Sequence, residues 1–326
     1  IIIRDPAALE KLDTCRTIIL DKTGTLTFGR PQLTDEMYAP GAVRPQVLSY
    51  AASLEQYSKH PLAAAIIDAT DRARMHRHQV ERIEEKPGAG ISGVVDGHTV
   101  EITGRGPLQR QGRLAGLTLP PQGTGLECIV FLDGAYVATY RFHDQPREDT
   151  HSFIDHLGAK HAFDKVMIVS GDRESEVRYL AEQVGVTEVH AEAEPEEKVR
   201  IVREETERAR TLFLGDGIND APAMINATVG VALGQTSDVT AEAADMVIME
   251  SSLRRVDELF HIARRLRRIA LQSALGGMAL SIAGMFVAAA GYLPPVAGAI
   301  SQEIIDLAAV LNALRMAVTP RDLTDY

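Results

Sequence analysis

The sequence has few cysteines, no tryptophan and fewer basic than acidic residues. Cys15 and Cys128 are the only cysteines among 326 residues, which argues against a disulfide framework and favours a reducing compartment. Lys and Arg total 34 against 45 Asp and Glu, giving a net charge of −11. Nucleic acid is therefore not expected as the main partner, because a phosphate backbone requires a basic surface. A local nucleotide pocket stays compatible with this charge.

Charge is also missing near the end of the chain, where no charged residue lies between Arg268 and Glu303. Residues 274–293 are almost wholly apolar, which is the length that a helix needs to cross a bilayer. A second apolar segment, 296–318, follows a Gly and Pro break, and arginines cluster at 264–268. Since basic residues favour the cytoplasmic side, we predict a membrane hairpin with both ends there. The alternative is a pair of buried core helices in a soluble protein.

The first 250 residues are predicted to form an α/β fold. Five short apolar runs are typical of buried parallel strands: 17–20, 166–169, 211–214, 229–233 and 246–249. Helical patterns such as 174–184 and 196–208 separate them, and this alternation predicts a doubly wound parallel sheet. Three of the runs lead into Asp21, Asp172 and Asp216. Because ligands bind beyond the carboxyl ends of such strands, we expect three carboxylates at one edge of the sheet.

The separation between the first two strand runs is too long for one crossover and predicts an inserted α+β domain. Helical patterns and hairpin turns at Asp96-Gly97 and Asp133-Gly134 support this insertion. The predicted organisation is a linker helix with the first part of the sheet domain, the insertion, the remainder of the sheet domain, and the hairpin with a short tail: residues 1–28, 29–142, 143–253 and 254–326.

The sequence DKTGTLT (residues 21–27) follows the first predicted strand and suits phosphoryl transfer. Asp21 is the candidate nucleophile, since a carboxylate at a strand end beside hydroxyls and a tight turn can attack phosphorus. The transferred group carries negative charge and requires a metal ion and a cation. Asp216 and Asp220 offer hard oxygen ligands for Mg²⁺, together with Asp21 and Thr23.

Further polar residues are candidates at the same edge. Lys198 is the candidate cation, although a lysine in the charged run EPEEK is by default a solvated helix residue. Ser170 and the amide of Gly171 can donate hydrogen bonds to a phosphoryl group. Asp172, the last residue of the SGD sequence, completes the candidate catalytic set.

Together these motifs resemble those of the P-type ATPases, cation pumps of the haloacid dehalogenase superfamily. DKTGTLT matches the phosphorylation signature, GDGIND (215–220) matches the Mg²⁺ loop, and SGD (170–172) resembles a Thr-Gly-Asp motif. The resemblance implies ATP and Mg²⁺ as cofactors and an aspartyl-phosphate at Asp21. Soluble phosphatases with this sheet commonly carry a second Asp at the position of Thr23, so we expect slow hydrolysis of that intermediate.

The predicted insertion resembles the nucleotide-binding domain of the heavy-metal subclass. SKHPL (58–62) resembles its His-Pro motif, which implies that His60 lies near the adenine. Glu55 stands where that family has a nucleotide-contacting Glu, and Gly88 and Gly90 look like its Gly-x-Gly nucleotide loop. Taken singly, His60 is by default a surface histidine, and the Gly-x-Gly sequence is by default a hairpin turn. Their order inside the insertion favours a nucleotide site.

The sequence LNALR (311–315) also resembles the end of the last membrane helix of heavy-metal pumps. Glu303 and Asp306, three residues apart, share one helix face, and acids inside a membrane are functional candidates by default. The alternative places them at a helix end near the lipid headgroups. Their oxygen atoms favour a harder divalent ion such as Zn²⁺, Co²⁺, Mn²⁺ or Fe²⁺ as the transported ion.

The resemblance covers nearly the whole chain but only the C-terminal half of such a pump. The actuator domain and earlier membrane helices are absent, so we expect a truncated product or fragment that performs partial reactions. Its implied partners are the lipid bilayer, a divalent heavy-metal ion and the N-terminal half, with cytoplasmic catalytic domains on a multi-pass membrane protein. Two alternatives stay open: a soluble phosphohydrolase sharing the fold, and a non-catalytic pump remnant that binds nucleotide.

Overall fold

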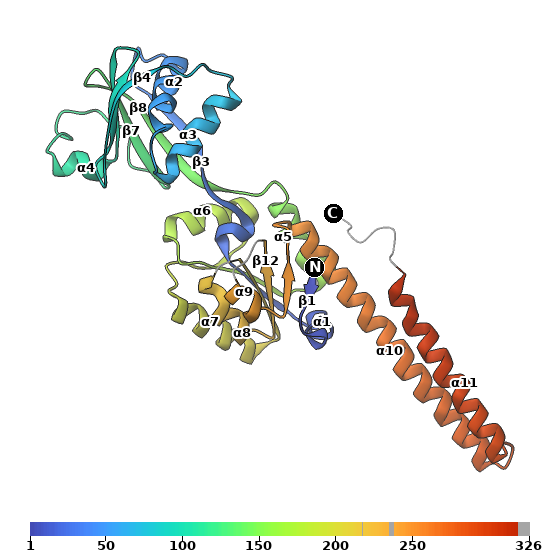
Figure 1. Cartoon of the computed structure of the whole chain (residues 1–326). Coiled ribbons are helices and arrows are strands. Elements are labelled where there is room, and N and C mark those ends of the chain that lie inside the picture. Colours follow the sequence, from blue (N-terminus) through green and yellow to red (C-terminus); the bar gives the residue numbers. More distant parts are fainter. Residues whose placement is uncertain (217, 235–237, 319–326) are drawn as a thin grey trace. The chain divides into compact units, whose positions relative to one another are not determined.

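The computed structural model describes residues 1–216, 218–234 and 238–318. The chain divides into two compact units (Figure 1). The first unit contains Ile1–Leu26, Glu148–Gly171 and Val184–Tyr326, and the second contains Thr27–Arg147 and Asp172–Gln183. Each unit has a sheet of its own.

The first unit is built on a seven-stranded sheet with the order β1-β13-β12-β11-β2-β9-β10. Every pairing is parallel except that of β1 with β13. The strands are β1 (Ile2–Ile3), β2 (Thr17–Leu20), β9 (Lys165–Val169), β10 (Glu188–His190), β11 (Thr211–Gly215), β12 (Val229–Leu233) and β13 (Met246–Ile248). The five predicted strands are present, and the doubly wound parallel fold is confirmed.

Helices flank this sheet, and α7 shows how a helix buries apolar side chains against it. In α7 (Pro195–Arg208), Pro195 stands in the first turn and Arg208 in the last, which suits the helix ends and the dipole. Ile201 and Val202 of α7 are buried against Phe213 of β11. The other helices beside the sheet are α1 (Pro6–Leu12), α5 (Thr150–His161), α8 (Ala221–Asn226) and α9 (Asp238–Ala243).

The second unit contains a six-stranded antiparallel sheet with the order β3-β8-β7-β6-β5-β4. Its strands are β3 (Thr27–Tyr38), β4 (Val80–Lys86), β5 (Gly90–Val95), β6 (His98–Thr103), β7 (Leu126–Leu132) and β8 (Ala135–Pro146). The two predicted hairpin turns are present, with positive φ at Asp96, Gly97, Asp133 and Gly134, as tight two-residue turns require. Strands β3 and β4 were not predicted from the sequence.

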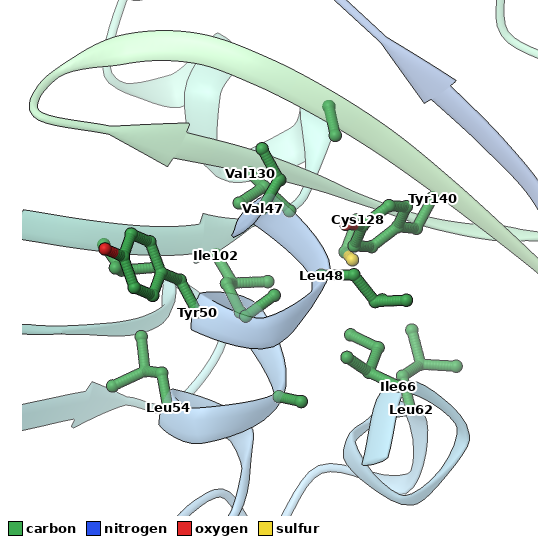
Figure 2. Close-up of a cluster of buried hydrophobic side chains, with 14 of the residues drawn as sticks. Val47, Leu48, Tyr50, Leu54, Leu62, Ile66, Ile102, Cys128, Val130 and Tyr140 are labelled. Atoms are coloured by element: carbon green, nitrogen blue, oxygen red, sulfur yellow. The ribbon is translucent and has the colours of Figure 1, made fainter. Parts of the chain in front are cut away.

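Helices α2 (Arg44–Glu55) and α3 (Pro61–Arg72) pack on the second sheet and enclose its core, while α4 (Arg105–Arg110) and α6 (Glu174–Val184) complete the helices of this part. Figure 2 shows Leu48 of α2 beside Ile66 of α3 and the strand residue Tyr140. All three side chains are fully buried. This packing therefore fixes the end of α2 and the start of α3, where Glu55 and His60 lie.

Two long helices end the described chain. Helix α10 (Leu253–Ala289) begins beside α1 and α5, and α11 (Pro295–Ala313) returns along it (Figure 1). Both contain a window long and apolar enough to cross a membrane, and only 6% and 0% of these windows are buried. The alternative of two buried core helices is therefore wrong for this hairpin. Residues 319–326, the end of the predicted tail, lie outside the described residues.

We expect Leu48→Ala to lower the free energy of unfolding of the second unit by about 2–5 kcal/mol, because it leaves a cavity in a fully buried cluster. The matched control is Leu126→Ala, whose side chain is 47% exposed; its expected effect is within about 0.5 kcal/mol.

Tyrosine fluorescence during urea unfolding measures both variants, since the chain has no Trp. Six of the eight tyrosines lie in the second unit: Tyr38, Tyr50, Tyr57, Tyr136, Tyr140 and Tyr179. Equal midpoints for the two variants would contradict the assignment of Leu48 to the core.

Candidate functional site

Three neighbouring strands of the first unit end at the same edge of the sheet. Strand β2 lies between β9 and β11, and Asp21, Ser170 and Asp216 follow these strands. Carboxylate oxygens of Asp21, Asp216 and Asp220 all lie within 4.8 Å of one another. Two of the three predicted edge acids, Asp21 and Asp216, therefore lie together with Asp220, whereas Asp172 is not a member of this group. Asp172 is grouped with the second unit, and its catalytic role stays a prediction.

Lys198 joins two of these carboxylates. Its Nζ donates hydrogen bonds to Oδ1 of Asp21 at 2.6 Å and to Oδ1 of Asp220 at 2.7 Å. Helix α7 places Lys198 in its first turn, and all three residues are at most 6% exposed. The interpretation of Lys198 as a solvated surface lysine is therefore wrong.

Burial is the largest influence on the pKa values of Asp21 and Lys198. It raises the pKa of Asp21 to about 7; the Asp220 carboxylate acts in the same direction and Lys198 opposes it. Burial would lower the pKa of Lys198, but the charges of Asp21 and Asp220 outweigh this effect and raise it. Lys198 therefore stays charged. The group offers oxygen atoms of three carboxylates, Asp21, Asp216 and Asp220, and this donor set fits a divalent cation with oxygen preference.

Two glycines let the loops approach these carboxylates. Gly24 lies in the turn Lys22–Leu26 with φ +75°, and a Cβ there would lie 1.7 Å from Oδ2 of Asp216. A Cβ on Gly215 would lie 2.6 Å from Oδ2 of Asp220. Gly24 is thus favoured by its positive φ, and a side chain at either glycine would displace the neighbouring carboxylate. Gly217 of the GDGIND motif lies outside the described residues.

The remaining predicted residues of this edge differ in exposure. Thr23 is exposed in the turn after β2, whereas Ser170 is 2% exposed at the end of β9. The backbone N–H of Ser170 donates to the carbonyl of His190 at 2.9 Å, and its carbonyl accepts from the N–H of Ala193 at 3.0 Å. Gly171 is exposed directly after it. Their roles in holding a phosphoryl group stay predictions.

A separate cavity of about 630 Å³ lies in the second unit. This volume is in the range of small-molecule sites. Glu55, His60, Gly88 and Gly90, the four predicted nucleotide residues, all line it. They come from the end of α2, the start of α3 and the turn between β4 and β5. Residues more than 30 positions apart in the chain therefore meet at one cavity.

Local hydrogen bonds fix the cavity wall. His60 is the N-cap of α3, and its Nδ1 accepts from the N–H of Leu62 at 3.3 Å. Ser58 Oγ accepts from the N–H of His60 at 3.1 Å and donates to Oε1 of Glu85 at 2.7 Å. A Cβ on Gly90, whose φ is +114°, would lie 2.2 Å from the carbonyl oxygen of Ile102. The turn therefore requires glycine at this position.

Glu55 is a buried acid in the cavity wall. Glu55 is 5% exposed. Within the described part of the chain, its Oε2 has no hydrogen-bond partner. Burial raises the pKa of Glu55 to about 7. Such a carboxyl can accept a hydrogen bond from a ligand that enters the cavity.

The cavity wall formed by the strands was not predicted from the sequence. Ile91, Ile102 and Cys128 line it from β5, β6 and β7. The alternation of apolar and polar residues along these strands predicts only that the three side chains are buried. The motifs that can be recognised in the sequence lie instead in the loops.

The two predicted membrane acids lie on α11. Both Glu303 and Asp306 are exposed in this chain. Oδ1 of Asp306 accepts from Nε2 of Gln302 at 3.1 Å, and Oε1 of Gln302 accepts from Oγ of Ser281 on α10 at 3.0 Å. A polar chain therefore connects Asp306 to the neighbouring helix. The role of both acids in ion binding stays a prediction.

Comparisons with known proteins identify relatives across almost all of the chain. Residues 15–228 match the family model of haloacid dehalogenase-like hydrolases. The chain is 34% identical to "Copper-transporting ATPase 2" of Rhizobium meliloti (strain 1021), covering 97% of this chain and 40% of that protein. It is 33% identical to "Zinc-transporting ATPase" of Synechocystis sp., covering 97% of this chain and 44% of that protein.

Solved structures show the same likeness. A zinc-transporting PIB-type ATPase in the E2.Pi state matches with a TM-score of 0.84 and 29% identity, covering 97% of this chain and 52% of that one. The catalytic domain of the CPx-ATPase CopB-B matches with a TM-score of 0.59 and 28% identity, covering 79% of this chain and 94% of that one. The chain spans about 40% of the length of the first curated relative. The resemblance to heavy-metal P-type ATPases is confirmed, and the chain belongs to the haloacid dehalogenase-like hydrolases.

Proposed function

We propose that this chain is the ATP-driven core of a heavy-metal P-type ATPase and forms an aspartyl-phosphate at Asp21. The observation that carries the proposal is the buried Lys198 between Asp21 and Asp220, with Asp216 beside them. This group combines a nucleophile, a fixed cation and spare oxygen ligands. The cavity of nucleotide size in the second unit supports ATP as the phosphoryl donor.

In the proposed reaction, a carboxylate oxygen of Asp21 attacks the γ-phosphorus of ATP. The bond from phosphorus to the β–γ bridging oxygen breaks, and ADP leaves with that electron pair. Lys198 favours the ionised form of Asp21, because its charge partly opposes the burial that raises the pKa of this carboxyl to about 7. Ser170 and the amide of Gly171 donate hydrogen bonds to the phosphoryl oxygens, and Asp172 supports this end of the site.

Asp21, Thr23, Asp216 and Asp220 are the residues that would hold Mg²⁺. The bound ion would neutralise charge on the phosphoryl group in the transition state. Thr23 supplies a hydroxyl where phosphatases of this fold use a second acid. The aspartyl-phosphate therefore lacks a general base within the first unit's DKTGTLT turn and hydrolyses slowly.

In the second unit, ATP occupies the cavity with its adenine near His60. Oε2 of Glu55 accepts a hydrogen bond from the adenine amino group, which gives this buried oxygen a partner. Gly88 and Gly90 bring the turn between β4 and β5 close to the nucleotide. Delivery of the γ-phosphate to Asp21 then couples the two units.

The long hairpin supports a membrane location for this chain. The apolar windows of α10 and α11 are exposed, which favours a membrane pump over a soluble phosphohydrolase. The transported ion is a divalent heavy metal, with Glu303 and Asp306 as candidate ligands. Transport requires the lipid bilayer and the N-terminal half of the pump, and the catalytic domains face the cytoplasm.

We expect the chain to become labelled when it is incubated with Mg²⁺ and γ-labelled ATP and quenched in acid. The label is stable in acid and labile to hydroxylamine, because an acyl-phosphate has this chemistry. Asp21→Asn lowers it to background, since an amide is a poor nucleophile, and chelation of Mg²⁺ does the same. The matched control Asp68→Asn, at an exposed position of α3, retains it.

Label that survives Asp21→Asn would refute the nucleophile. Nucleotide binding without any label in the wild type would instead favour the non-catalytic remnant. Label that clears within the mixing time would favour a phosphohydrolase.

We expect His60→Gln to weaken ATP binding about tenfold, the order of one lost stacking contact. The maximum label at saturating ATP stays unchanged, because the Asp21 group is not altered. Titration of labelling against ATP concentration measures both quantities. His76→Gln, an exposed histidine of the same unit, is the control. An ATP affinity equal to that of this control would remove His60 from the adenine site.

We expect Glu55→Gln to remove a pH dependence of stability in the second unit. The folded pKa of Glu55 is about 7 against an ordinary value of 4.5. The folded state therefore binds more protons, and wild-type stability falls as pH rises through this window. Between pH 6 and pH 8 the fall is about 1 kcal/mol.

Urea unfolding followed by tyrosine fluorescence measures this difference. The variant should show a flat profile over the same range, while Glu81→Gln on the exposed face of β4 keeps the wild-type slope. Parallel profiles for wild type and Glu55→Gln would show that Glu55 titrates normally.

A further inference from the structure

Three histidines and one aspartate meet where α5 packs against α10, away from the Asp21 group. His156 and His161 belong to α5, and Asp257 and His261 belong to the first turns of α10. One ligand atom from each residue lies within 4.8 Å of the others. All four residues belong to the first unit.

The Asp257 carboxylate is the centre of this cluster. Its Oδ1 lies 2.6 Å from Nε2 of His161 and 3.3 Å from Nε2 of His156, and its Oδ2 lies 3.5 Å from Nε2 of His261. The ring of His161 lies 5.0 Å from those of His156 and His261, at 66° and 77° to them. The imidazoles therefore present nitrogen atoms to a common point and are not stacked.

Hydrogen bonding alone leaves this cluster incompletely satisfied. Asp257 is 0% exposed, yet its Oδ2 has no hydrogen bond in the described part of the chain, and the same holds for Nδ1 of the buried His161. The nearby guanidinium of Arg264 pairs with Asp13 at 3.5 Å and donates to the carbonyl of Lys160 at 2.5 Å. A buried carboxylate among imidazole nitrogens is stabilised by a cation placed between them.

We propose that His156, His161, Asp257 and His261 bind one divalent transition-metal ion of the Zn²⁺ class. Three imidazole nitrogens and a carboxylate oxygen form a four-ligand set typical of Zn²⁺, whereas Mg²⁺ prefers oxygen alone. Bonds of about 2.0–2.1 Å to a tetrahedral ion separate the ligand atoms by about 3.4 Å. The 3.3 Å distance from Oδ1 of Asp257 to His156 agrees with this spacing, and the 2.6 Å contact of the same oxygen with His161 lengthens on binding. The nitrogen of His261 lies 3.5 Å from the second oxygen of the carboxylate.

The spacing on α10 supports the assignment. Asp257 and His261 are four residues apart, so one helix face presents both. The side chain of His261 is 25% exposed while the other three are at most 8% exposed, which gives an ion access from solvent at one corner. The bound ion ties α5 to the helix that continues into the apolar hairpin, at a place separate from both Asp21 and Glu303.

The test uses the full chain in detergent micelles, stripped with a chelator and kept in excess Mg²⁺ so that the acidic edge is occupied. Co²⁺ is the spectroscopic probe. We expect an intense visible absorption band, typical of four-coordinate Co²⁺, that saturates at one equivalent and disappears when Zn²⁺ is added. Octahedral oxygen sites give only weak absorption, so they do not mimic this signal.

Removal of one ligand should weaken Zn²⁺ binding more than about 100-fold, beyond the usual cost of losing a residue that merely supports a ligand. His161→Gln and His261→Gln are the test variants. His261→Gln decides the outcome if His161→Gln fails to fold, because His261 is partly exposed. The matched control is His151→Gln, an exposed histidine of the same helix, and Asp306→Asn controls for the candidate transport site.

The proposal is supported if the band is lost in the test variant and kept in both controls. Absence of the band in the wild type, or its persistence in His261→Gln, overturns it. A band lost only in Asp306→Asn would assign the ion to the hairpin and also overturn it. None of these outcomes depends on phosphorylation of Asp21, so the result is independent of the proposed function.

Discussion

The ammonium of Lys198 between the carboxylates of Asp21 and Asp220 is the interaction on which the catalytic unit depends. Burial of Asp21 at the end of β2 favours its protonated form, and Lys198 opposes this effect with a short hydrogen bond to it. Lys198 donates a second short hydrogen bond to Asp220, after β11. A lysine lost from this position would leave buried acids without a counter-ion. Both the proposed chemistry and the stability of the fold therefore require α7 to begin beside these acids, so that Lys198 in its first turn reaches them.

The parallel sheet explains why so few residues make this site. Adjacent parallel strands end at one edge, so Asp21 and Asp216 become neighbours although 195 positions separate them in the chain. Gly24 and Gly215 then allow the two loops to approach each other more closely than any side chain would permit. Backbone geometry thus sets the positions of the carboxylates before any ligand binds.

The strand-end motifs were predictable because their chemistry is concentrated in short segments of sequence. DKTGTLT and GDGIND carry acid, hydroxyl and glycine within a few residues, and the apolar runs before them identify the strands. Strand β3 was not predicted because its sequence, TFGRPQLTDEMY, contains polar residues and lies half-exposed. The burial of Lys198 also could not be predicted, since EPEEK has the composition of a solvated helix surface. Only the packing of α7 on the sheet distinguishes a buried Lys198 from a solvated one.

Asp21, Asp257 and Glu55 are three of the buried acidic residues, and the fold compensates their burial in different ways. Asp21 has a lysine, and Asp257 lies among three imidazoles. Within the described part of the chain, Oδ2 of Asp257 and Oε2 of Glu55 each have no hydrogen-bond partner. A fold tolerates such an oxygen when a ligand later supplies the missing donor, because the desolvation cost is then recovered on binding. The cavity beside Glu55 has room for such a donor. For a nucleotide bound there as proposed, occupancy of the cavity is expected to stabilise the end of α2.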